Sequence, residues 1–188
     1  MPAPGLVAAV DAAADRFGLS RQVLRALVDQ ESSWREDVIS SAGAVGLTQV
    51  MPATGLEVAE ELDRRGVLEL PAGTGEGEIA SMLLDPAFNA TLGAAYLSKQ
   101  LARFGDLRVA LAAYNGGPGY MARKLAEHGS YDAAEPTLWT ETRNYVRRIL
   151  ERLNGARDAR APSELPGGLV LLGGGAILAG ALYLLSRR

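Results

Sequence analysis

The chain has 188 residues, of which 48% are hydrophobic and 22% are charged, and its formal net charge is -3. This length can bury one ordinary hydrophobic core, and the absence of lysine or arginine runs among 19 basic and 22 acidic residues disfavours a nucleic-acid partner. With no cysteine and one histidine, the sequence excludes disulfides, a cysteine nucleophile and metal sites that need cysteine or two histidines. Carboxylates or hydroxyls should therefore carry any enzyme chemistry, and we expect no cofactor and no metal.

The first two predicted helices lie at the start of the chain. Apolar residues recur at helical spacing between Leu6 and Phe17 and stop at Gly18, which predicts the first helix. Ser20 is suited to cap the second one. Acidic residues interrupt the first apolar stretch, so we expect no export signal there.

The second helix carries a carboxylate in an unusual position. Glu31 continues, at position i+7, an apolar stripe that starts at Leu24 and includes Leu27. Desolvation and the negative end of the helix dipole should both raise its pKa, as a general acid at neutral pH requires. The alternative is that Glu31 turns to solvent or pairs with Arg35.

The segment at residues 40–52, SSAGAVGLTQVMP, is small and punctuated by glycine, which is typical of a binding loop. We expect Ser40, Gln49 and Met51 to contact a ligand. The Gln49 amide can donate to and accept from hydroxyl or acetamide groups, and Met51 offers an apolar contact to the face of a sugar. A plain turn is the alternative for Gly43.

Further helices are predicted in the second half of the chain. An aspartate and a proline at residues 85–86 are typical of a helix start, and this helix should end at Gly105. Others are expected at residues 107–114, at 120–127 and around 146–153. Strand patterns of useful length do not occur, although a small hairpin near Val67 to Gly77 is an alternative. We predict an all-α domain over residues 1–155.

Tyr114 and Asn115 stand beside three glycines in the segment NGGPG at residues 115–119, which we expect to form a loop. An aromatic ring and an amide in this setting suit a carbohydrate groove. They suit a turn at a helix end equally well.

The C-terminal part differs from the rest in composition. Residues 165–186 carry no charge, and at about 1.5 Å per residue they could span the roughly 30 Å hydrocarbon layer of a bilayer. We therefore predict a linker at residues 156–166 and a transmembrane helix at 167–186, with a buried core helix as the alternative. The small pair Ala176 and Gly180 suits contact with helix partners in the membrane.

Four motifs stand in a fixed order along the chain: ESSW at residues 31–34, the segment at 40–52, AYNGG at 113–117 and ETRNYV at 141–146. Together they resemble the catalytic domain of the soluble lytic transglycosylase family, which has a goose-type lysozyme-like fold. Thr48 departs from the pattern, because the family usually has methionine there.

The resemblance implies cleavage of the β-1,4 bond between N-acetylmuramic acid and N-acetylglucosamine by Glu31 alone. Glu31 would protonate the leaving oxygen and then deprotonate the muramoyl C6 hydroxyl, which closes a 1,6-anhydro ring. By resemblance, Glu141 lies near the groove and supports Glu31 through charge or hydrogen bonds, and Tyr145 lies one helical turn further on. The partner would be the glycan strand of peptidoglycan.

Two alternatives remain at this level. One is a hydrolysing muramidase, which needs a second carboxylate about 5 to 9.5 Å from the acid, with Asp37 and Glu141 as the candidates. The other is a non-catalytic protein that binds the cell wall or a virion membrane on the same scaffold. The intact Glu31 favours an enzyme.

The expected substrate lies outside the cytoplasmic membrane, whereas the only expected membrane segment comes last in the chain. We therefore expect a protein anchored to a lipid membrane by its C-terminal helix, in a phage particle that opens the wall locally while its DNA is delivered. A cellular secretion machine is the alternative.

Overall fold

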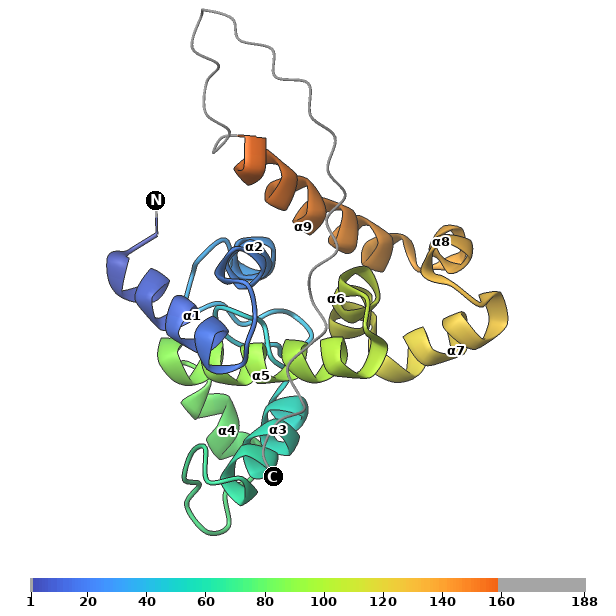
Figure 1. Ribbon diagram of the computed structural model, residues 1–188. Helices are drawn as coiled ribbons and strands as arrows, with labels where there is room; N and C mark the ends of the chain where they lie inside the picture. Colours follow the sequence, from blue (N-terminus) through green and yellow to red (C-terminus); the bar gives the residue numbers. More distant parts are fainter. Residues whose placement is uncertain (1, 159–188) are drawn as a thin grey trace, which may run out of the picture.

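The computed structural model describes residues 2–158, which fold into nine α-helices and one short 3-10 helix (Figure 1). The elements are α1 (Pro4–Arg16), α2 (Arg21–Ser32), α3 (Pro52–Arg64), α4 (Glu76–Met82), α5 (Pro86–Phe104), α6 (Leu107–Gly116), α7 (Pro118–His128), α8 (Tyr131–Ala134), η1 (Glu135–Thr137) and α9 (Thr140–Asp158). The predicted all-α class is confirmed for these residues.

The predicted membrane helix at residues 167–186 and residues 159–166 of the predicted linker lie outside the described residues. Within residues 2–158, no helix combines the length and the apolar composition needed to cross a bilayer.

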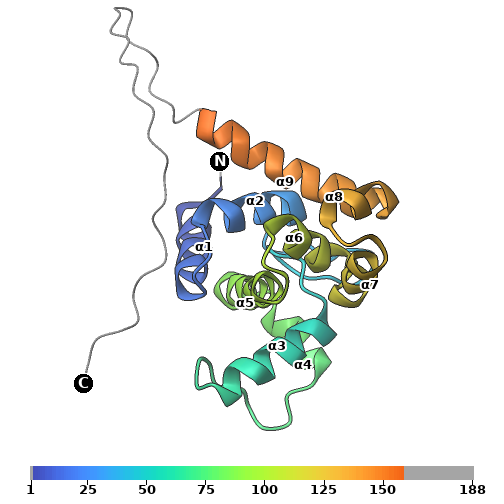
Figure 2. The same ribbon diagram turned by 45° about the vertical axis from the view of Figure 1, so that its right-hand side comes forward.

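Helix α5 lies at the centre of the fold. Figure 2 shows α2, α6 and α9 above it, α1 beside it and α3 and α4 below it. The helix begins as predicted, because the Asp85 carboxylate accepts a hydrogen bond from the Phe88 backbone N–H at 2.7 Å and Pro86 occupies the first turn. It ends at Gly105, whose φ of 72° is left-handed.

Two apolar clusters pack on opposite sides of α5. The larger one joins α5 to α1, α2, α6, α7 and α9, and its largest fully buried side chains are Leu24, Leu27, Leu47, Leu97, Leu111, Met121 and Ile149. The smaller one joins α5 to α3 and α4 through Val58, Leu62, Ile79, Leu83 and Leu92. The second cluster therefore holds α3 and α4 as a small lobe below α5.

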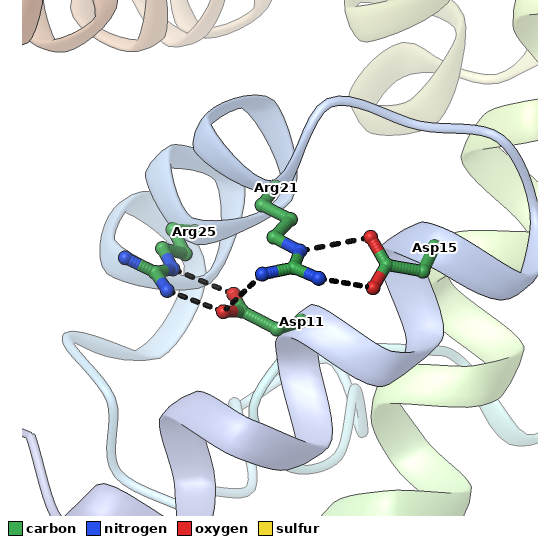
Figure 3. A network of polar contacts seen from close by, with 4 residues as sticks. All are labelled: Asp11, Asp15, Arg21 and Arg25. Atoms are coloured by element: carbon green, nitrogen blue, oxygen red, sulfur yellow. Dashed lines mark hydrogen bonds and ion pairs between the residues drawn. The ribbon is translucent and has the colours of Figure 1, made fainter.

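Four charged side chains connect α1 to the start of α2 (Figure 3). Arg21 holds Asp15 through two bonds, of 2.8 and 2.5 Å, and Arg25 holds Asp11 in the same two-pronged way. Because at least one partner of each pair is exposed, each pair contributes about 0–1 kcal/mol, so their main effect is to fix the direction of α2. Ser20 occupies the predicted cap position, but its hydroxyl makes no capping hydrogen bond.

The loop predicted at residues 115–119 is wrong. Helix α6 continues through Asn115 and Gly116, and Gly117 alone, with a φ of 92°, separates it from α7. Pro118 begins α7 because the first helical position needs no N–H donor. Asn115 is therefore held in the last turn of a helix.

The alternative of a small hairpin near Val67 to Gly77 is also wrong. Residues 67–75 form turns and irregular chain, and α4 starts directly after them. Within the described part of the chain, strand-like pairing is limited to isolated bridges from Val45 to Ile39 and to Val50. Both bridges lie in the segment between α2 and α3.

Candidate active site

The segment at residues 38–50, here called the glycine-rich loop, is folded back on itself. Val45 pairs with Val50 through two backbone hydrogen bonds of 3.0 and 3.2 Å, and the Gly46 N–H donates to the Val38 carbonyl at 2.8 Å. Gly46 has a φ of 76°, and a Cβ there would lie 2.3 Å from the amide nitrogen of Asn89. Only glycine therefore fits this point of the loop.

The side chain of Asn89 on α5 anchors the glycine-rich loop through hydrogen bonds. Its amide nitrogen donates to the carbonyls of Val45 and Leu83, at 2.8 and 3.0 Å. Its Oδ1 accepts from the Thr48 backbone N–H at 2.8 Å and from the Thr48 hydroxyl at 2.6 Å. Thr48, the departure from the family pattern, is buried over Gly93 and so anchors the loop.

Glu31 lies in the last turn of α2, which ends because Ser33 and Trp34 adopt left-handed φ angles of 51° and 65°. Tyr145 on α9 donates a hydrogen bond of 2.6 Å to Glu31 Oε1. Arg35 instead donates to the backbone carbonyl of Ser32 at 3.3 Å, and no bond between Arg35 and Glu31 is present in the described part of the chain. The alternative in which Glu31 pairs with Arg35 is therefore wrong.

The environment of Glu31 favours its protonated form. Burial is the largest influence and raises its pKa to about 7. The hydrogen bond from Tyr145 opposes this effect by stabilising the carboxylate, whereas the negative charge of Glu141 adds to it. At neutral pH a substantial fraction of Glu31 therefore carries a proton that it can donate.

Glu141 is exposed in the first turn of α9. It influences Glu31 through its charge, and the described residues show no hydrogen bond between the two. The expected role of Glu141 in supporting Glu31 stays a prediction.

Tyr114 connects α6 to the glycine-rich loop. Its hydroxyl donates to the Thr48 carbonyl at 2.8 Å, and its ring packs against Tyr96 with the centroids 5.2 Å apart. Burial and the nearby charge of Glu31 raise the pKa of Tyr114 and of Tyr145 well above 10. Both hydroxyls therefore remain neutral donors over the working pH range.

Asn115 faces α9 at the end of α6. Its Oδ1 accepts a hydrogen bond of 2.8 Å from the Thr142 hydroxyl. The contact is close because Gly116 has no side chain: a Cβ there would lie 3.1 Å from both the Thr142 hydroxyl and the Tyr120 ring. Asn115 is thus fixed relative to Glu141, the neighbour of Thr142.

Three expected ligand contacts lie on the glycine-rich loop and at its exit. Gln49 has a left-handed φ of 48°, and its amide nitrogen donates to the carbonyls of Val38 and Gly46 at 3.0 and 2.8 Å. Its Oε1 is therefore the atom that it can offer to a ligand. The Ser40 hydroxyl accepts from the Ala44 N–H at 3.0 Å and retains its own proton to donate. Met51, at the start of α3, is 42% exposed.

The structure thus joins Glu31 to Tyr145 and Tyr114 to the glycine-rich loop by hydrogen bonds, and Thr142 joins Asn115 to the start of α9 beside Glu141. Tyr114 lies close enough to Glu31 for the charge of Glu31 to raise the pKa of Tyr114. In the part of the chain that is described, no three acidic or histidine side chains gather in a way that could hold a metal ion. The chemistry that this arrangement offers is proton transfer by one carboxyl group flanked by neutral hydroxyl donors.

Comparison with known proteins identifies the family. Residues 8–136 match the family described as "Transglycosylase SLT domain", which is more than half of the chain. The chain belongs to this family. The SLT match ends before α9, so Glu141 and Tyr145 join the site on the evidence of geometry.

Relatives of this SLT domain come from bacteria and from a phage. The soluble lytic murein transglycosylase of Salmonella typhimurium is 35% identical over 137 residues, covering 70% of this chain and 20% of that protein. The transglycosylase of Enterobacteria phage PRD1 is 32% identical over 108 residues, covering 57% of this chain and 33% of that protein. The chain therefore spans about a fifth to a third of these relatives.

A solved structure supports the fold assignment. The lytic transglycosylase Slt of Pseudomonas aeruginosa, an inactive mutant in which a glutamate is replaced by glutamine, superposes with a TM-score of 0.65 at 33% identity. The match covers 83% of this chain and 24% of that one. The expected SLT-type fold is thereby confirmed.

Proposed function

We propose that this domain is a lytic transglycosylase that cleaves the β-1,4 bond between N-acetylmuramic acid and N-acetylglucosamine. The observation that carries the proposal is the pairing of Glu31 with Tyr145, which presents a half-buried carboxyl group with a pKa of about 7. Family membership and the printed names of the relatives support the same activity.

The first step requires the protonated form of Glu31. Its proton passes to the oxygen that bridges the two sugars, and the bond from the muramoyl C1 to that oxygen breaks. The electron pair leaves with the oxygen, so N-acetylglucosamine departs with a free hydroxyl. Glu31 is then a carboxylate, which the Tyr145 hydroxyl stabilises across 2.6 Å.

The second step uses that carboxylate as a base. Glu31 removes the proton from the C6 hydroxyl of the muramoyl residue, and the C6 oxygen bonds to C1 of the same sugar. A 1,6-anhydro ring forms and Glu31 is protonated again, so water is not consumed. Ser40, Gln49, Met51, Tyr114 and Asn115 would hold the sugars along the groove.

A hydrolysing muramidase is the alternative chemistry. It needs a second carboxylate to activate or replace water. Asp37 and Glu141 are both exposed. The relatives' printed names, which are those of lytic transglycosylases, favour the single-carboxylate route.

Digestion of peptidoglycan in ¹⁸O-labelled water distinguishes the two reactions. A transglycosylase yields muramoyl ends lighter by one water than hydrolysed ends, without ¹⁸O. Incorporation of one ¹⁸O at the new muramoyl end would identify a hydrolase and contradict the proposed chemistry.

We also propose that the enzyme acts from a membrane, in a phage particle that opens the cell wall during DNA delivery. The uncharged segment at residues 165–186 and the relative in phage PRD1 support this setting. The full chain should then require detergent for extraction, whereas residues 1–158 should be lytic without it. A full chain that stays monomeric without detergent would contradict the anchor.

A further inference from the structure

Trp139 is a large aromatic side chain that the catalytic scheme leaves unused. It precedes α9 and is 58% exposed, whereas its neighbour Leu138 is buried. One face of its indole ring is covered, because the Tyr120 ring stacks on it with the centroids 3.9 Å apart and the planes 11° apart. The other face is therefore open to solvent.

Two hydrogen bonds fix the backbone of Trp139. The Trp139 N–H donates to the Tyr120 hydroxyl at 2.8 Å, and the Trp139 carbonyl accepts from the Arg143 N–H at 3.0 Å. Tyr120 is itself buried on α7. The stacked pair is thus a rigid aromatic platform that pays little conformational entropy on binding a ligand.

This platform is continuous with the candidate active site. Tyr120 and Thr142 both pack over Gly116, and Thr142 holds Asn115. Figures 1 and 2 both show α7, α8 and the start of α9 together at one end of the molecule.

The same segment carries Glu141, two residues after Trp139, whose charge raises the pKa of Glu31. The platform therefore adjoins the elements that surround the acid.

We propose that Trp139, supported by Tyr120, is a binding subsite for a pyranose ring of the glycan strand, beyond the two sugars that react at Glu31. The open indole face suits the apolar C–H face of a β-linked N-acetylhexosamine, and the indole N–H at the ring edge can reach its hydroxyl or acetamide oxygens. The identity of the sugar polymer rests on the proposed function, whereas the presence of the platform does not.

The subsite should strengthen the binding of long strands and leave the chemistry unchanged. Loss of the flat ring in Trp139→Leu should raise KM for long glycan strands about tenfold, with kcat unchanged, since one aromatic contact contributes about that factor. Trp139→Phe should retain most of the affinity, because it keeps a flat ring. Leu84→Ala, which shortens another large exposed apolar side chain, is the matched control.

Two readouts on the full chain test this subsite. The first is KM and kcat on long strands and on a tetrasaccharide, whose four sugars we expect to fall short of the platform. The second is the NMR signal of the Trp139 indole N–H in Glu31→Gln during titration with chitohexaose. The chain has two tryptophans, so Trp34→Phe assigns the signals.

We expect the Trp139 signal to shift with chitohexaose, and Trp139→Leu to lose affinity only for long strands. An unmoved Trp139 signal together with an unchanged KM in Trp139→Leu, in a chain that still lyses peptidoglycan, would overturn the subsite and leave the proposed function intact. A shifted signal in Glu31→Gln, together with a wild-type chain that does not lyse peptidoglycan, would support the subsite and contradict the proposed function. The subsite would also be overturned if Trp139→Leu abolished self-association of the chain and left chitohexaose binding unchanged.

Discussion

Tyr145 on α9 donates a hydrogen bond of 2.6 Å to Glu31 on α2, although the two residues are 114 positions apart in the chain. Arg152, further along α9, binds Asp29 at 2.5 Å and Gln30 at 2.9 Å, so the end of α2 is held at a second point. The last helix therefore completes the environment of the acid. Its packing against α2 couples the fold to the chemistry.

The pH dependence should report the raised pKa of Glu31. The free enzyme needs this residue protonated, so kcat/KM should be high below pH 7 and fall above it, with a midpoint near the pKa of about 7. Glu141→Gln removes a negative charge that raises this pKa, so the midpoint should move to lower pH. Glu151→Gln, which removes an acidic group elsewhere on α9, is the control and should leave it in place. A midpoint insensitive to Glu141 would refute the charge coupling.

Tyr145→Phe should slow the chemical step and shift its pH dependence. It removes the donor that stabilises the Glu31 carboxylate, so kcat should fall about 10- to 100-fold, the usual worth of a hydrogen bond to a charged group. The pKa of Glu31 should rise, because the lost bond lowers it, and the high-pH limb should move upward. Tyr131→Phe, at another buried tyrosine on α8, serves as the control. Unchanged kcat and pH profile in Tyr145→Phe would argue against a role in the reaction.

Asn89→Ala should destabilise the glycine-rich loop and, with it, the candidate active site. It leaves the amide of Thr48 and the carbonyls of Val45 and Leu83 without their buried partner. The free energy of unfolding should fall by about 2–5 kcal/mol, measured by denaturant titration, and activity should fall as the glycine-rich loop loosens. Thr91→Ala on the same helix is the matched control. Stability equal to that of the control would show that Asn89 is not the anchor.

Local patterns in the sequence predicted much of the fold. The aspartate and proline at residues 85–86 predicted the start of α5, and Gly18, Gly105 and Gly129 each follow the end of a predicted helix. Periodicity also placed Glu31 on a buried stripe, which agrees with the structure. These features are visible because they depend on residues close together in the chain.

Other parts of the site depend on contacts between distant residues. The amide of Asn89 acts on a loop 41 positions earlier, and nothing in its own helix indicates this. The stack of Trp139 on Tyr120 cannot be read from the sequence either, because it joins α7 to the residue that precedes α9. The loop expected at residues 115–119 was wrong because a single glycine with positive φ is enough to break α6, so the other residues stay helical.

The activity of Glu31→Gln tests the catalytic role of Glu31 most directly. The side chains are nearly the same size, so the variant should fold with a melting temperature close to that of the wild type, but it has no proton to donate and no carboxylate to accept one. We predict that its rate of release of muropeptides from peptidoglycan is lower by at least about 10²- to 10⁴-fold at pH 6. A folded Glu31→Gln protein that releases muropeptides at a rate near that of the wild type would contradict the assignment of Glu31 as the catalytic acid and base.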